Sequence, residues 1–500
     1  MHHMASLSEE FSLLPGALDH FIDGAYVASV NRARFDTIAP ATGQTLGSVA
    51  LGGSVEINLA AESAQRALAG PWGKTSASER ARILHQVGDL ILQHADQLAR
   101  IETMDTGKPL SETLTGDIAR AAANFHFYAG LGTHQVAPAY FGADGSQHLS
   151  YREPMGVVGL ITPWNLPLYL ATWKLAPALM QGNTIILKPA ELTPLSALAL
   201  THILTAAGVP PGVVNVVQGM GAEGAGEALV RHPEVRAISF TGESCTGEHI
   251  MRAAAPNLKK LSFELGGKGA SVIFADADLD AAATFAVKAA FRNQGQVCLA
   301  GSRLLVQRQV YAETIARVLA ATKLIRVGDP LDIKTTMGSL ICQDHRSKVI
   351  EFVDYARSQS GTEVLCGGQI PSLWPSGAFY EPTILTGMPQ QSRLIQEEIF
   401  GPVLTVQVFD DEAEALAMLN GTRYGLSCSI YTRDIGRAQR MAKAARMGLV
   451  WINTWFVRDL HTAFGGMKRS GLGREGGQHS LDFFSEYKTI TTAAAAPEGQ

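Results

Sequence analysis

The stretch Phe263-Glu264-Leu265-Gly266-Gly267-Lys268 marks the junction between the two halves of this 500-residue sequence. It closes a short apolar run, Leu261–Leu265, with a carboxylate, two glycines and a lysine. Short apolar runs that alternate with helical stretches are typical of βαβ units and a mostly parallel sheet. Four such runs precede the junction, at Val157–Thr162, Thr184–Leu187, Val213–Val217 and Ala237–Thr241.

A second α/β series follows, from residue 270 to about 455, with apolar runs such as Ser271–Phe274 and Val403–Val408. Ahead of both series, Ser76-Ala77-Ser78-Glu79 is a capping box that predicts the start of a helix. A further helix is expected over 112–130. The segment 131–151 lacks clear periodicity and predicts a hairpin or an arm, and 483–495 predicts an extended tail.

Composition narrows the classes of function. The chain is 46% hydrophobic and 17% charged, with a net charge of −5, which indicates a globular protein without nucleic acid or an anionic membrane as partner. Its five cysteines have no C-x-x-C spacing and no Cys/His cluster is present, which favours a reducing compartment and no metal site. No apolar run reaches the ~18 residues that span a bilayer. Residues 1–4 do not resemble a secretion signal, so we expect a cytoplasmic chain.

Polar residues and glycines follow each apolar run of the first series, where ligands bind in open α/β sheets. We therefore expect one shared site at this edge. Gly219-Met220-Gly221-Ala222-Glu223-Gly224 matches G-x-G-x-x-G, but it follows the third run and lacks a clear ribose-binding acid at the expected distance. It is either a dinucleotide loop or a loop chosen for turn geometry. Lys188 and Glu191, after the second run, are candidates to grip adenosine ribose hydroxyls.

Cys298 is the candidate nucleophile. It ends the stretch Asn293-Gln294-Gly295-Gln296-Val297-Cys298, which follows a long Ala-rich helix predicted from Ala281 to Ala290. A thiolate is a strong nucleophile once its pKa falls below the free value of about 8.5. The alternative is that Cys298 is a buried apolar filler, which is our interpretation of the other four cysteines.

Taken jointly, these motifs resemble the aldehyde dehydrogenase superfamily over nearly the whole chain. The resemblance implies the α/β aldehyde dehydrogenase fold, with a Rossmann-like NAD-binding domain over 1–130 and 152–262 and an α/β catalytic domain over 263–465. It also implies a small β oligomerisation arm over 131–151 and 483–495, in a homodimer or homotetramer. It rests on the two stretches above and on Pro163-Trp164-Asn165, Lys188-Pro189-Ala190-Glu191, Phe240-Thr241-Gly242, Glu397-Glu398-Ile399-Phe400-Gly401-Pro402 and Phe464-Gly465-Gly466.

The resemblance implies a role for each catalytic candidate. Cys298 would attack the aldehyde to give a thiohemiacetal and later a thioester, while Asn165 and the Cys298 backbone N–H hold the oxyanion. Glu264 would activate the water that releases the acid, and its presence favours hydrolysis over transfer to coenzyme A. Lys174 and Glu475 match a proton relay, although Glu475 has the alternative of an exposed surface acid.

NAD is the cofactor that the resemblance implies. Glu191 favours NAD over NADP because a carboxylate accepts bonds from the ribose 2′-hydroxyl but repels a 2′-phosphate, and Glu243 adds negative charge nearby. The implied cofactor-binding residues are Thr162, Pro163, Trp164, Lys188, Glu191, Gly221, Gly242, Glu243, Leu265, Glu398 and Phe400.

Arg120 and Arg458 point to an acidic substrate, because an arginine fork pairs bidentately with a carboxylate. Their positions resemble the 2-hydroxymuconic and 2-aminomuconic semialdehyde dehydrogenases of aromatic-compound degradation, in which matching arginines bind the far carboxylate. Either arginine alone has the alternative of a surface ion pair. The other implied substrate-binding residues are Trp173, Tyr169, His461 and Phe464, of which Tyr169 and His461 depart from the usual residues of those relatives.

Three alternatives remain open at this point. The first is an NAD-dependent dehydrogenase of another acidic or aromatic aldehyde, such as succinic or carboxymethyl-hydroxymuconic semialdehyde. The second is a Cys-dependent esterase that uses Cys298 and Glu264 without a nicotinamide, and the third is a non-catalytic relative. Retention of Lys188, Glu191 and Glu398 argues against the second, and the intact Cys298 and Glu264 argue against the third.

Overall fold

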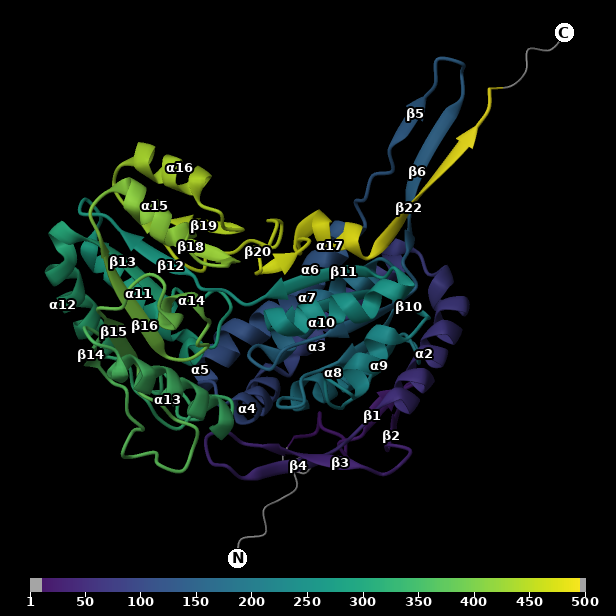
Figure 1. Ribbon diagram of the computed structural model, residues 1–500. Coiled ribbons are helices and arrows are strands. Elements are labelled where there is room, and N and C mark those ends of the chain that lie inside the picture. Colours follow the sequence, from purple (N-terminus) through teal and green to yellow (C-terminus); the bar gives the residue numbers. More distant parts are fainter. Residues whose placement is uncertain (1–10, 495–500) are drawn as a thin grey trace, which may run out of the picture.

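The computed structural model describes residues 11–494, which form two α/β lobes and a projecting arm (Figure 1). The expectation about a secretion signal concerns residues 1–4, which lie outside the described residues, as does residue 495, the last residue of the predicted arm. Between residues 11 and 494, no helix is long and apolar enough to cross a membrane.

The first lobe is built on an eight-stranded sheet whose five central strands are parallel. These five strands are the apolar runs of the first series, so the predicted βαβ organisation is confirmed. The sequence does not predict the three short edge strands, of which the last comes from near the C-terminus. In sheet order the strands are β2 (Ala25–Val27), β1 (His20–Ile22), β9 (Val214–Val216), β8 (Thr184–Lys188), β7 (Val157–Ile161), β10 (Val235–Gly242), β11 (Lys260–Leu265) and β21 (Gly471–Leu472).

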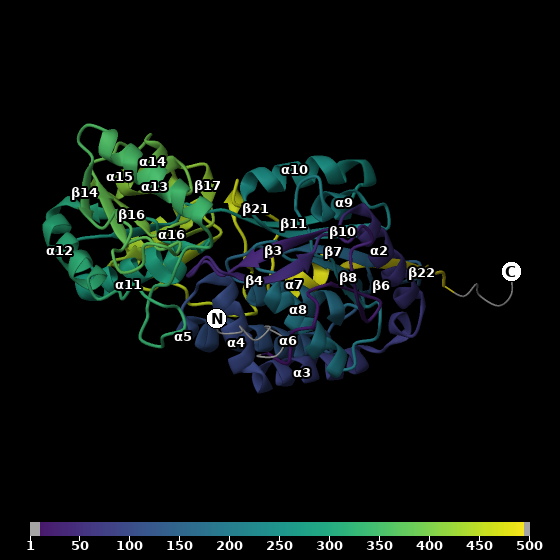
Figure 2. The same ribbon diagram turned by 90° about the horizontal axis from the view of Figure 1, so that it is seen from below.

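Helices cover both faces of this sheet (Figures 1 and 2). Five long helices contribute to one apolar core with the first face, and three helices contribute to a second core with the opposite face. The first group is α3 (Ala77–Gln93), α4 (Ala95–Thr106), α6 (Ala119–Gly132), α7 (Pro167–Met180) and α8 (Leu195–Ala206), and the second is α2 (Ser54–Ala69), α9 (Ala225–Arg231) and α10 (Ser244–Ala254).

The helices between residues 76 and 132 start as predicted but are interrupted. Ser76 Oγ accepts a hydrogen bond from Glu79 N at 3.2 Å, and Glu79 Oε2 accepts one from Ser76 N at 2.7 Å, which confirms the capping box. The helix expected over 112–130 is instead α5 (Leu110–Glu112), a π-helical turn over Thr113–Ile118, and α6. Such turns occur frequently at functional sites, and this one borders a pocket.

The second lobe is a seven-stranded sheet that is parallel apart from its edge strand β14, and it confirms the second α/β series. Helices α11 and α12 pack on one face, α15 and α16 on the other, while α13 and α14 form a separate core with β15 and β16. In sheet order the strands are β14 (Glu363–Cys366), β15 (Thr383–Thr386), β16 (Val403–Phe409), β13 (Arg303–Gln307), β12 (Ala270–Ile273), β18 (Ser427–Tyr431) and β19 (Leu449–Ile452). The helices are α11 (Leu279–Phe291), α12 (Tyr311–Thr322), α13 (Gln343–Ser358), α14 (Arg393–Gln396), α15 (Glu412–Asn420) and α16 (Ile435–Ala444).

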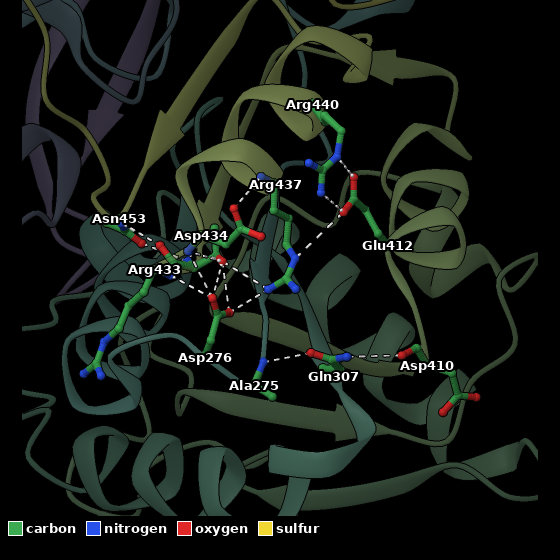
Figure 3. Close-up of polar contacts among 11 residues, drawn as sticks. Ala275, Asp276, Gln307, Asp410, Glu412, Arg433, Asp434, Arg437, Arg440 and Asn453 are labelled. Atoms are coloured by element: carbon green, nitrogen blue, oxygen red, sulfur yellow. Dashed lines mark hydrogen bonds and ion pairs between the residues drawn. The ribbon is translucent and has the colours of Figure 1, made fainter.

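A polar cluster around Asp276 fixes the loop between β18 and α16 (Figure 3). The Asp276 carboxylate accepts hydrogen bonds from Thr432 Oγ1 at 2.8 Å, from Asp434 N at 3.0 Å and from Arg437 Nη1 at 2.7 Å. These bonds satisfy the backbone at the start of α16. Burial opposes the shift, but the hydrogen bond from Thr432 and the charge of Arg437 hold the pKa of Asp276 below its ordinary value. The cluster stabilises this loop and does not line the cleft described below.

The arm is a three-stranded antiparallel sheet that projects from the first lobe (Figure 1). Strands β5 (Ala139–Phe141) and β6 (Gln147–Pro154) form a hairpin, and β22 (Ser485–Thr492) pairs along the whole of β6. Tyr140 and Phe141 are 65% and 76% exposed, a pattern that suits contact with another chain. Two small sheets complete the fold, β3 (Arg34–Ile38) with β4 (Thr45–Ala50) and β17 (Tyr424–Gly425) with β20 (Met467–Lys468).

Candidate active site

A cleft of about 790 Å³ lies where the carboxyl ends of the first sheet face the second lobe. All eleven residues predicted to bind the cofactor line this cleft, from Thr162 after β7 to Phe400 before β16. Cys298, Glu264 and Asn165 line it as well. The structure therefore brings together residues that lie more than two hundred positions apart in the sequence.

A smaller pocket of about 330 Å³ adjoins the cleft beside Cys298. Val297 lines the small pocket, whereas Cys298, the next residue, lines the cleft. Likewise, Leu166 lines the small pocket, whereas Asn165, the residue before it, lines the cleft. Cys298 and Asn165 therefore lie on the cleft side of the boundary between the two cavities.

The loop that carries Cys298 has an unusual backbone. Asn293 and Gln294 adopt left-handed φ angles of 49° and 57°, directly after α11 ends. Asn293 Nδ2 donates to the carbonyl oxygens of Asn165 at 3.0 Å and Gln296 at 3.1 Å, which holds the turn. A Cβ at Gly295 would lie 2.1 Å from the Gly401 carbonyl oxygen, so this close approach requires glycine. The loop thus presents Cys298 rigidly.

The Asn165 amide is placed by the same loop. Its Nδ2 donates to the Gln296 carbonyl oxygen at 2.8 Å, and the residue is 5% exposed. An amide nitrogen has two hydrogens, so one remains to be directed toward the cleft. This geometry fits the predicted role of an oxyanion donor.

Glu264 and Cys298 influence each other's ionisation. Glu264 is buried at the end of β11, and both of its carboxyl oxygens lack a hydrogen-bond partner among residues 11–494. Burial raises the pKa of Glu264 to about 7, against an opposing interaction with Cys298. Burial and the neighbouring Glu264 also raise the pKa of the Cys298 thiol well above its ordinary value. The charge of Arg458 acts in the opposite direction but does not offset the burial and the Glu264 carboxyl.

Glu475 and Lys174 form a buried ion pair. Lys174 Nζ lies 2.5 Å from Glu475 Oε1, and Trp173 Nε1 donates to Glu475 Oε2 at 2.7 Å. Ser239 Oγ accepts from Lys174 Nζ at 3.0 Å and lies 3.2 Å from Glu475 Oε1. Glu475 is 7% exposed, so the alternative of a surface acid is wrong.

Arg120 and Arg458 lie on one wall of the small pocket, and neither forms an ion pair with a carboxylate within the described chain. Each guanidinium carbon lies 5.5 Å from the centre of the Trp173 ring. Arg458 Nη1 donates to the Tyr169 hydroxyl at 2.6 Å, whereas Nε and Nη2 of Arg120 are buried without a hydrogen-bond partner in residues 11–494. The alternative of surface ion pairs is therefore wrong.

The remaining predicted substrate residues separate into two groups. Trp173 and Phe464 belong to one apolar cluster next to Cys298, and the Arg458 guanidinium lies 4.0 Å from the Phe464 ring centre. His461 does not line either cavity; its side chain is 73% exposed and pairs with Asp459 Oδ1 at 2.8 Å. The structure thus does not bring His461 to the pocket wall.

Several lining residues were not predicted from the sequence. In the small pocket they include Arg292, Phe456 and the buried ion pair of Lys108 with Asp117. In the cleft, His345 Nε2 lies 2.7 Å from the Phe400 carbonyl oxygen. No motif surrounds these residues, and the single available signal was the position of Arg292 between the Ala-rich helix and Cys298.

The cleft fits a dinucleotide. Gly221 has no atom within 4 Å of where a Cβ would stand, so its backbone is open to the cleft. The N-terminus of α10 opens onto the same cleft at Ser244, and such an end attracts phosphate. Glu398 Oε1 accepts from Gly267 N at 2.8 Å, and burial raises its pKa to about 8. The buried Thr241 hydroxyl, without a hydrogen-bond partner in residues 11–494, also lines the cleft.

Comparisons with known proteins agree on one family. Residues 26–490 match the model described as "Aldehyde dehydrogenase family". A 2-hydroxymuconic semialdehyde dehydrogenase of Pseudomonas sp. (strain CF600) is 47% identical, covering 95% of this chain and 99% of its own length. A human 2-aminomuconic semialdehyde dehydrogenase is 44% identical, covering 95% and 98%.

Solved structures give the same result. Betaine aldehyde dehydrogenase from Staphylococcus aureus, solved with NAD⁺, superimposes with a TM-score of 0.94 at 36% identity, covering 99% of this chain and 97% of its own. An aldehyde dehydrogenase from Bacillus cereus in its NAD⁺ complex has a TM-score of 0.94 at 35% identity, covering 99% of both chains. The predicted fold and family are confirmed: the chain belongs to the aldehyde dehydrogenase family and is an aldehyde-oxidising oxidoreductase.

Proposed function

We propose that this enzyme oxidises an acidic semialdehyde of the 2-hydroxymuconic or 2-aminomuconic type to the carboxylic acid, with NAD as the acceptor. The observation that carries the substrate proposal is the pair of guanidinium groups on one pocket wall, Arg120 and Arg458, without a carboxylate partner of their own. A carboxylate at the far end of a semialdehyde would satisfy both, because charge-assisted bonds to a carboxylate are strong. The printed names of the relatives at 47% and 44% identity support the same substrate class.

The chain's own residues supply the nucleophile, the oxyanion donors and the base. The Cys298 thiol first loses its proton to water in the cleft, and the resulting thiolate attacks the carbonyl carbon. The Asn165 amide and the Cys298 backbone N–H stabilise the oxyanion of the thiohemiacetal. After oxidation to the thioester, the Glu264 carboxylate removes a proton from water, which attacks the acyl carbon and releases the acid and the Cys298 thiol. Lys174 and Glu475 lie behind Glu264 as a buried pair able to relay that proton.

NAD, when bound, supplies the hydride acceptor. The residues that would hold it are those of the large cleft, with Glu398 and the Lys188–Glu191 pair as its polar contacts. Lys188 Nζ lies 2.7 Å from Glu191 Oε2, which orients that carboxylate for a ribose hydroxyl and disfavours a 2′-phosphate. A cleft of this size and lining argues against a Cys-dependent esterase that needs no dinucleotide.

We also propose the domain division and the assembly. Residues 1–130 and 152–262 form the NAD-binding domain, 263–465 the catalytic domain, and 131–151 with 483–495 the oligomerisation arm of a dimer or tetramer. The exposed aromatic side chains of β5 support the assembly role of the arm. After the second lobe the chain returns to the first, where β21 pairs with β11 and is followed by helix α17 (Gly477–Phe483).

Kinetics of Arg120→Ala and Arg458→Ala with 2-hydroxymuconic semialdehyde test the substrate proposal. Each variant is expected to raise KM by about 10- to 100-fold, because one charge-assisted contact to the substrate carboxylate is lost. The measurement is NADH formation over a range of substrate concentrations. Arg317→Ala, which removes an arginine from the outer surface of α12, is the matched control and is expected to leave KM unchanged.

A neutral aldehyde distinguishes the loss of carboxylate binding from a general loss of enzyme function in these variants. With propanal, both pocket variants are expected to keep the KM of the parent within about twofold, since no carboxylate is present to lose a contact. An equal loss with both aldehydes, or no loss with the acidic one, would contradict the carboxylate role of the two arginines.

A further inference from the structure

Arg292 lines the small pocket and has no role in the mechanism above. It is the first residue after α11 and stands six positions before Cys298. The left-handed turn at Asn293 and Gln294 follows it directly. The loop that presents the nucleophile therefore also fixes the base of the Arg292 side chain.

The Arg292 guanidinium is held in place but keeps free donors. Its carbon lies 4.7 Å from the centre of the Phe456 ring, a cation–π contact. Nη2 packs over Gly116 of the π-helical turn, where an added Cβ would lie only 3.2 Å away. Nε lies 3.6 Å from Glu112 Oε2, which is an ion pair beyond hydrogen-bond distance. Because a guanidinium has five N–H donors, Arg292 retains donors for a ligand.

The charges around the small pocket do not balance. One carboxylate, Asp117, lines it, and this group is bound to Lys108 in a buried ion pair. A substrate carboxylate placed between the two arginines already discussed leaves Arg292 without an equal counter-charge. The nearby Glu112 does not line the pocket, and its Oε2 stays 3.6 Å from Arg292 Nε. The lining cations are Lys108, Arg120, Arg292 and Arg458.

We propose that Arg292 binds a second oxyanion of the substrate, in addition to the carboxylate assigned to Arg120 and Arg458. The inference rests on the proposed function and narrows its substrate class to semialdehydes that carry two anionic groups. Two sources supply the second oxyanion, a second carboxylate or the ionised enol of a 2-hydroxy group. Phe456 and Gly116 hold the guanidinium at the wall, so that it receives this group without a rearrangement of the loop.

Arg292→Gln tests the inference with three substrates. Succinic semialdehyde has one carboxylate and no enol, 2-hydroxymuconic semialdehyde adds the enol, and 5-carboxymethyl-2-hydroxymuconic semialdehyde adds both the enol and a second carboxylate. The variant is expected to raise KM by about 10-fold or more for a substrate with the second oxyanion, with kcat within about twofold and succinic semialdehyde unaffected. Lys288→Gln, which removes an exposed cation one turn earlier on α11, is the matched control.

The pattern over the substrates identifies the source of the oxyanion. If Arg292→Gln raises KM for both muconic substrates, the second oxyanion is the enol. If it raises KM for the carboxymethyl compound alone, the second oxyanion is the second carboxylate. Equal KM changes with all three substrates, a general fall in kcat, or no change overturns the inference and leaves the proposed function in place. A parent enzyme that oxidises none of the three contradicts the proposed function itself.

Discussion

Replacement of Cys298 with Ala is expected to lower kcat for aldehyde oxidation by at least about 10⁴-fold, as is typical when an enzyme loses its nucleophile. Cys298 is partly exposed at the boundary between the cleft and the small pocket, and its loop is held by hydrogen bonds from Asn293. Removing one sulfur atom therefore removes the reacting group and leaves the cavities intact. The measurement is NADH formation at saturating aldehyde and NAD.

Two controls test whether the loss of activity comes from the missing Cys298 thiol itself. The variant is expected to bind NAD with the affinity of the parent in calorimetry, because the predicted cofactor contacts lie elsewhere in the cleft. Cys366→Ser, at a half-buried cysteine on the edge strand β14, is expected to keep parental activity. Turnover by Cys298→Ala at a tenth of the parental rate or more would rule out Cys298 as the nucleophile.

Glu264→Gln is expected to lower steady-state kcat by about 10²- to 10⁴-fold, the usual contribution of a general base. Glutamine has nearly the same shape, and the Glu264 oxygens lose no protein hydrogen bond because they have none within the described residues. The first turnover is expected to survive, so rapid mixing should show a burst of about one NADH per active site, followed by slow thioester hydrolysis. Absence of the burst together with a lost first turnover would assign Glu264 to the earlier step.

The raised pKa of Glu264 also predicts how the steady-state kcat depends on pH. Burial raises this pKa to about 7, and Glu475, Lys174, Arg458 and Cys298 are the titratable or charged groups that act on it. A carboxyl must be ionised to act as a base, so its contribution is present above pH 7 and is lost as the pH falls through about 7. The steady-state kcat of the parent should therefore fall between about pH 8 and pH 6, whereas that of Glu264→Gln should not follow this transition.

Much of the fold is predictable because apolar runs and turn residues are local signals. The five parallel strands of the first sheet and the capping box at Ser76 follow directly from such patterns. The short strands β1, β2 and β21 do not, because two- or three-residue strands are defined by their partners and carry no periodicity of their own. The π-helical turn at Thr113–Ile118 escapes for a related reason, since an apolar pattern does not distinguish it from an α-helix.

In the candidate site too, residues inside sequence motifs are predictable and residues outside them are not. Residues inside motifs, such as Glu264, Cys298 and Glu398, are found in the cleft where the sequence places them. His345 carries no local signal and Arg292 carries only its position just before the Cys298 stretch, so tertiary packing decides that both line the cavities. The raised pKa of the Cys298 thiol is not predictable from the motif, because desolvation depends on the surrounding atoms. His461 shows the reverse error, since proximity to Arg458 in sequence does not place its side chain in the pocket.

The central claim, that this enzyme selects an aldehyde by a distant carboxylate, is tested most directly by comparing two substrates with the parent enzyme. The substrates are 2-hydroxymuconic semialdehyde and its carboxyl methyl ester, which differ in charge but hardly in shape, and the measurement is kcat/KM from NADH formation. We predict that the acid is preferred by about 100-fold or more, because the neutral ester cannot form ion pairs with Arg120 and Arg458. Equal kcat/KM values, or a preference for the ester, would contradict the account.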